Sequence, residues 1–177
     1  MTTFDIRHST FAIGRGEEMG ARVIGIGNPL RGDDGVGPAV VEALKRRGLP
    51  EGVEAVDGGQ AGLGLVGLME GADRVVLVDA AEMGAEPGAF RAFGPEEALM
   101  AGEALGCGVH GARVGVALRM AEALGCLPPD VKVVGVQPRQ MGWGVGLSRE
   151  VSQALPRVVR AVLEVLGSSC GSCIREE

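Results

Sequence analysis

The chain has 177 residues, a formal net charge of −6 and only two lysines, Lys45 and Lys132. This length suits a single domain that buries about two-thirds of its unfolded surface, so folding requires neither a metal nor a disulfide. The acidic balance argues against nucleic-acid binding, which needs a basic face, and the apolar segments are too short to insert into a membrane.

The two ends of the chain lack apolar periodicity. Charged residues recur through residues 1–20, so we expect a flexible N-terminal extension without a secretory signal. Residues 168–177 are small and polar, and we expect a flexible tail that carries Cys170 and Cys173. Residues 21–167 between them are predicted to form one domain. The cysteines are expected to be reduced thiols of a cytoplasmic protein.

Short apolar runs alternate with helical patterns along this domain. In chain order, they predict a strand at 23–26, a helix at 37–47, a strand at 53–56, a helix at 63–69, strands at 75–78 and 88–94, a helix at 113–124, a strand at 131–136 and a helix at 148–166. Ser148 is the expected N-cap of the last helix. The alternation predicts an α/β fold, a three-layer α/β/α sandwich with a largely parallel twisted sheet.

The first strand leads into a glycine-rich turn that ends in Asp33 and Asp34. Leu30 stands where a dinucleotide-binding fingerprint requires its third glycine, and no phosphate-binding lysine follows. Two carboxylates would repel an anion, so the turn suits a cation better. A nucleotide- or nucleoside-binding module stays an alternative, and either aspartate could simply cap the helix that follows.

Further polar residues follow the strands, at the sheet edge where α/β proteins bind ligands. Asp57 ends the second strand and Asp79 ends the third, while His110 lies just before the predicted 113–124 helix. Two carboxylates and an imidazole suit a borderline divalent cation such as Ni²⁺ or Zn²⁺. The alternatives are that Asp79 is a solvated turn residue and that His110 is structural.

Other catalytic arrangements are poorly supported. The only serines between residues 20 and 167 are Ser148 and Ser152, both at the start of the last helix, which makes a Ser-His-Asp site improbable. Cys107 lies three residues before His110, so a cysteine peptidase is an alternative. Trp143, between two glycines, is either a recognition element or a cover for one edge of the core.

Several motifs together resemble the hydrogenase maturation endopeptidases, in order from about residue 22 to residue 166. The segments are Gly25–Gly37 (GIGNPLRGDDGVG), Asp57–Gly62 (DGGQAG), Val78–Ala80 (VDA) and Gly135–Pro138 (GVQP), together with His110. The resemblance implies a phosphorylase/hydrolase-like α/β peptidase domain. Its implied activity is removal of the C-terminal extension from the large-subunit precursor of a nickel–iron hydrogenase after nickel insertion.

The resemblance also implies roles for individual residues. The metal-binding and catalytic positions of the family fall on Asp34, Asp79 and His110, and Asp33 would help to hold the loop. The metal would be nickel already bound in the precursor, and zinc or another divalent ion could substitute for it. The implied partner is the nickel-loaded large-subunit precursor.

Overall fold

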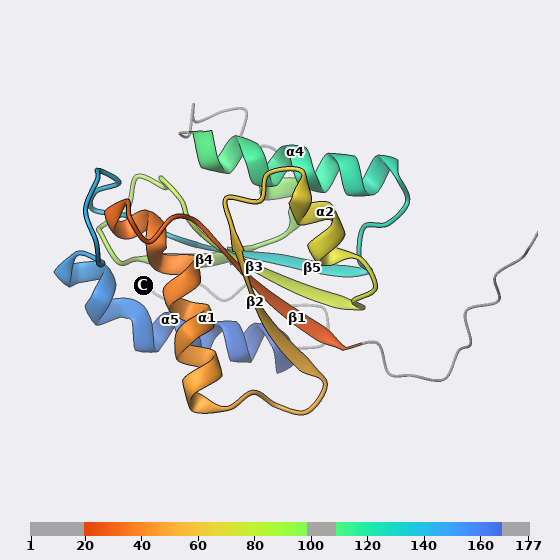
Figure 1. Cartoon of the computed structure of the whole chain (residues 1–177), viewed down its shortest axis with the longest axis horizontal. Coiled ribbons are helices and arrows are strands. Elements are labelled where there is room, and N and C mark those ends of the chain that lie inside the picture. Colours follow the sequence, from red (N-terminus) through yellow and green to blue (C-terminus); the bar gives the residue numbers. More distant parts are fainter. Residues whose placement is uncertain (1–19, 99–108, 168–177) are drawn as a thin grey trace, which may run out of the picture.

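The computed structural model describes residues 20–98 and 109–167, and within them the strands form one five-stranded sheet. Its strand order is β2-β1-β3-β5-β4 (Figure 1). The parallel strands are β1 (Ala21–Ile26), β2 (Val53–Gly59), β3 (Arg74–Ala80) and β5 (Asp130–Val136). The short β4 (Phe90–Phe93) pairs antiparallel with β5 at one edge, which confirms the extra strand that the sequence predicted.

Helices cover both faces of the sheet and give three layers (Figure 1). One face is covered by α1 (Val36–Arg47) and α5 (Arg149–Gly167), and the other by α2 (Gly64–Met69) and α4 (Val109–Ala123). Side chains of β3 alternate between the two cores: Val76 and Val78 pack on the α1/α5 side, whereas Val75 and Leu77 pack on the α2/α4 side. This alternation places Asp79 on the α2/α4 side of the sheet.

The predicted strands and helices are all found, and the three-layer α/β sandwich is confirmed. Several boundaries differ: β2 continues three residues beyond its predicted end, and β3 extends beyond both of its predicted ends. The largest difference is at α4. The helix expected at residue 113 begins at Val109, because Gly111 is accommodated in the first turn of α4, and His110 therefore lies in that turn and not in a loop. Ser148 is confirmed as a cap, since its Oγ accepts a hydrogen bond of 3.4 Å from the Val151 N–H.

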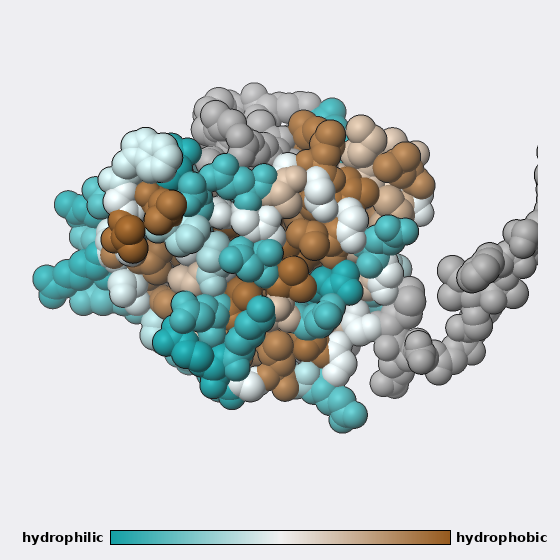
Figure 2. Space-filling view, in the orientation of Figure 1, coloured by the Kyte–Doolittle hydropathy of each residue, from teal (hydrophilic) through white to brown (hydrophobic). Residues whose placement is uncertain are grey.

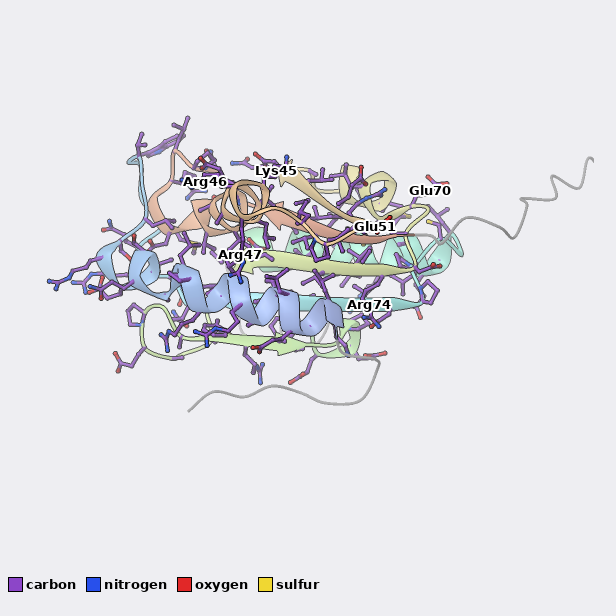
Figure 3. All side chains as sticks on the ribbon, turned by 90° about the horizontal axis from the view of Figure 1, so that it is seen from below. Lys45, Arg46, Arg47, Glu51, Glu70 and Arg74 are labelled. Carbon is purple, nitrogen blue, oxygen red and sulfur yellow. The ribbon has the colours of Figure 1, made fainter. Side chains whose placement is uncertain are left out.

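Two arginines fasten helix ends at the amino edge of the sheet. Arg22 of β1 donates to the Leu68 carbonyl at the end of α2, at 2.7 Å. Arg74 of β3 donates to the Leu166 carbonyl near the end of α5 and pairs with Asp130 at 2.7 Å. Arg74 is labelled at this end of the molecule in Figure 3. A cation at a helix C-terminus is favourable because the last carbonyls lack helical partners. The two arginines at the amino edge of the sheet therefore have a structural role.

None of the helices in the described part of the chain is long and apolar enough to cross a membrane. Nearly all of the predicted N-terminal extension lies outside the described residues, and so does the predicted C-terminal tail with Cys170 and Cys173. Cys107 also lies outside them. The expectations about them stay predictions.

Candidate functional site

The turn after β1 is built by glycines that allow very close backbone packing. Gly27 has a φ of +131°, and a Cβ there would lie 1.7 Å from the Asp34 carbonyl oxygen. A Cβ on Gly37 would lie 2.3 Å from the Ile26 carbonyl oxygen, so the first turn of α1 packs directly on β1. Between them, the short 3₁₀ helix η1 (Gly32–Gly35) carries both aspartates into the interior.

Asp33 is fully buried and fastens a distant loop. Its Oδ2 accepts hydrogen bonds from the backbone N–H groups of Arg139 (2.8 Å) and Gln140 (3.1 Å), and its Oδ1 accepts one from Ser148 (2.6 Å). Three donors satisfy both oxygens of this carboxylate. Asp33 therefore joins η1 to the loop that follows β5, in agreement with the expected loop-holding role.

Asp34 is also fully buried, but its carboxylate lies within its own turn. Its Oδ2 accepts a hydrogen bond of 3.0 Å from the Asn28 N–H. Neither aspartate caps α1, because the N-cap position is Gly35 and no side chain bonds the helix end there. The capping alternative for both residues is therefore wrong.

Asp79 lies at the carboxyl end of β3, the strand next to β1, and only 3% of its surface is exposed. Burial and, to a lesser extent, the nearby charge of Asp34 together raise the pKa of Asp79 to about 8. The Ala80 N–H, which donates to Oδ1 at 2.9 Å, acts against this shift. Asp79 is thus no solvated turn residue, and it shares a buried, electrostatically coupled site with Asp34.

The other predicted residues divide between the described and the undescribed parts. Asp57 is exposed and accepts a hydrogen bond from the nearby Gly59 N–H at 2.9 Å, so it does not join the pair. The backbone of His110 lies in the first turn of α4, but its side chain is outside the described residues. Among the residues that the structure does describe, no three His, Cys, Asp or Glu side chains group closely enough to hold a metal.

Gln137 is a polar residue of this edge to which the sequence analysis gave no role. It is buried directly after β5, and its Oε1 accepts from the Met83 N–H (2.7 Å) and the Ala85 N–H (3.3 Å). Its Nε2 donates to Glu82 Oε2 at 2.8 Å. Gln137 therefore holds the segment that follows Asp79. The rule that located Asp79, a polar residue at a strand end, would have found it.

Comparison with known proteins decides the family. The family model described as hydrogenase maturation protease matches residues 38–165, which is more than half of the chain. The chain belongs to the hydrogenase maturation proteases. Members of this family process the C-terminus of the hydrogenase large subunit, and this chain is a peptidase of that kind.

Individual relatives agree with this assignment. The hydrogenase 2 maturation protease of Escherichia coli is 33% identical over 159 residues, covering 88% of this chain and 95% of the relative. The hydrogenase expression/formation protein HupD of Bradyrhizobium diazoefficiens is 33% identical over 146 residues, covering 81% and 76%. The solved structure of the maturating endopeptidase HybD from E. coli superposes with a TM-score of 0.78 at 30% identity, covering 88% and 97%.

Proposed function

We propose that this maturation protease recognises nickel already bound in the hydrogenase large-subunit precursor, using Asp34, Asp79 and His110 as its ligands. Cleavage of the C-terminal extension then follows only after nickel insertion. The enzyme is in this sense an aspartate-dependent endopeptidase whose metal arrives with the substrate. Zinc or another borderline divalent cation can take the same oxygen and nitrogen ligands.

The observation that supports this proposal is the pair of buried carboxylates. Asp34 is fully buried and Asp79 nearly so, and the charge of one raises the pKa of the other. Two adjacent carboxylates in a low-dielectric site repel each other unless one of them is protonated or a cation lies between them. With a pKa of about 8, Asp79 holds a proton at neutral pH, and a divalent cation would displace that proton.

The position of α4 suits the third ligand. His110 lies in the first turn of this helix, which covers the same face of the sheet to which Asp79 belongs. Three protein ligands leave coordination positions for the groups that hold nickel in the precursor. A metal ion placed there also acts as a Lewis acid toward an adjacent carbonyl or a bound water.

The test compares nickel-loaded and nickel-free precursor, with the cleaved extension detected by mass spectrometry. Wild-type protein should process only the loaded form. Outer-shell changes at metal sites alone cost about 10–100-fold, so Asp34→Asn, Asp79→Asn and His110→Ala should each slow processing by about 100-fold or more.

Asp73→Asn is the matched control. Asp73 is an exposed aspartate directly before β3, at the opposite end of that strand from Asp79. This variant should process precursor at the wild-type rate. Efficient cleavage of nickel-free precursor, or full activity of His110→Ala, would contradict nickel recognition by these ligands.

A further inference from the structure

Exposed large apolar side chains lie in two separate groups in the described part of the chain. One group, which we call the loop patch, comprises Leu30, Trp143 and Val145, with exposed fractions of 53%, 84% and 86%. The other, the α2/α4 group, comprises Leu63 just before α2, Val116 and Met120 on α4, and Leu124 just after α4. Figure 2 shows brown atoms gathered both at the η1 end of the molecule, on the left, and over α2 and α4, at the upper right. Trp143 therefore does not cover a core edge, and that alternative is wrong.

The loop patch is held together by backbone hydrogen bonds. The Gly144 N–H donates to the Leu30 carbonyl at 2.9 Å, and the Gly32 N–H donates to the Gly144 carbonyl at 2.8 Å. Trp143 and Val145 flank Gly144 and are thereby placed beside Leu30. Arg31 adds a bond of 3.2 Å from its Nη2 to the Met141 carbonyl. The exposed side chains thus project from an ordered backbone, which lowers the entropy cost of binding.

The same turn carries both the loop patch and the aspartate site. Leu30 lies between Asn28, which donates to Asp34, and Asp33, which fastens both ends of the 139–148 loop. A groove of about 470 Å³ continues from the patch, between Val145 and Leu147 on one side and α1 on the other. The loop patch and this groove therefore adjoin the turn that carries Asp34.

We propose that Leu30, Trp143 and Val145 dock the hydrogenase large-subunit precursor, through apolar side chains next to its cleavage site, and that Trp143 is the main contact. This inference rests on the proposed function, because the precursor is the polypeptide that has to reach Asp34. Large aromatic side chains supply much of the binding energy at protein interfaces. The α2/α4 group belongs to other elements of the fold and is not part of the proposed docking surface.

A kinetic experiment separates docking from chemistry. Initial rates are measured against the concentration of nickel-loaded precursor for wild type, Trp143→Ala and Val145→Ser. Loss of contacts made equally in the bound and transition states raises KM and leaves kcat unchanged. We expect KM to rise about tenfold or more in Trp143→Ala, because truncating a central interface residue costs at least about that much. We expect kcat to stay within about twofold of wild type.

Leu124→Ser and Val116→Ser are the matched controls, since these residues are similarly exposed on the other apolar group. Both controls should keep the wild-type KM. An unchanged KM in Trp143→Ala, or an equal rise in the controls, would overturn the docking proposal. Cleavage of nickel-free precursor by the wild type would overturn nickel recognition instead, and the comparison of KM values would still decide the docking surface.

Binding can also be observed without cleavage. Trp143 is the only tryptophan in the chain, so protein labelled with 5-fluorotryptophan gives a single fluorine resonance from this site. Adding unlabelled precursor, at concentrations where sedimentation shows a complex, should shift or broaden that resonance. A resonance that stays unchanged in the complex would overturn the proposal.

Discussion

Neighbouring aspartates of η1 should respond in opposite ways to the same substitution. Asp33 accepts three backbone N–H groups through both of its oxygens, whereas asparagine offers one acceptor oxygen. In Asp33→Asn, that oxygen can keep the Arg139 and Gln140 donors, but the amide group then faces the Ser148 N–H, donor against donor. A hydrogen bond to a charged group contributes about 1.5–3 kcal/mol, and an unsatisfied buried donor costs about 1–3 kcal/mol.

The expected net loss for Asp33→Asn is about 3 kcal/mol, which lowers the melting temperature by roughly 6–12 °C in a chain of this size. Asp34→Asn should leave the stability close to that of wild type at neutral pH, because an asparagine oxygen can still accept from the Asn28 N–H and Asp79 is already protonated there. Processing should follow the reverse order, with Asp34→Asn inactive and Asp33→Asn active below its melting temperature.

Urea unfolding followed by circular dichroism measures both free energies. Hydrogen exchange at the amides of Arg139, Gln140 and Ser148 shows whether the loop is released in Asp33→Asn. Two results together would refute the clamp. One is an unfolding free energy of Asp33→Asn within about 0.5 kcal/mol of wild type, the range of ordinary surface substitutions, and the other is unchanged exchange at these amides.

Two further predictions concern Asp79 and Cys107. The folded pKa of Asp79, about 8, lies above the ordinary value of 3.8, so the folded state binds more protons between these values. The unfolding free energy of metal-free protein should therefore fall as pH rises from about 4 to about 8. Asp79→Asn should remove that fall in urea unfolding at pH 5, 6, 7 and 8, and parallel curves for the two proteins would contradict the burial of the charge. Cys107→Ala should retain processing, and thiol alkylation should not abolish it. A folded but inactive Cys107→Ala protein would instead favour the cysteine peptidase alternative.

The sheet could be predicted from the sequence because each strand can be identified from its own local residue pattern. The run at 75–78 is a short stretch of β-branched and aliphatic residues, buried on both faces, and both of its ends are polar. The polar residue that ends such a strand is also easy to find, which is why Asp79 could be placed at the edge in advance. The beginning of α4 was missed, since Gly111 weakens the local helix signal although the first turn tolerates it.

The different roles of Asp33 and Asp34 were implied by the family resemblance alone and had no local physical signal in the sequence. The partners of Asp33 are 106 to 115 positions further along the chain, so nothing near η1 identifies it as a clamp. The exposure of Trp143 had the same origin, because its loop is positioned by bonds to Leu30 and Gly32 and not by its own sequence. Long-range contacts of this kind become visible only in the folded chain.

The charge of Asp33 and the charges of the Asp34–Asp79 pair are accommodated in different ways. Three N–H donors compensate the charge of Asp33, so its burial is tolerated. The same three hydrogen bonds fix the position of the 139–148 loop. At Asp79, the opposing effect of the Ala80 N–H is smaller than the effects of burial and of the Asp34 charge, so the pKa stays high. Asp79 therefore stays protonated beside the charge of Asp34 at neutral pH, and a divalent cation would have to displace that proton. A site whose two carboxylates both ionise only around a cation can distinguish a nickel-loaded precursor from an empty one, provided that the neighbouring loop keeps its position.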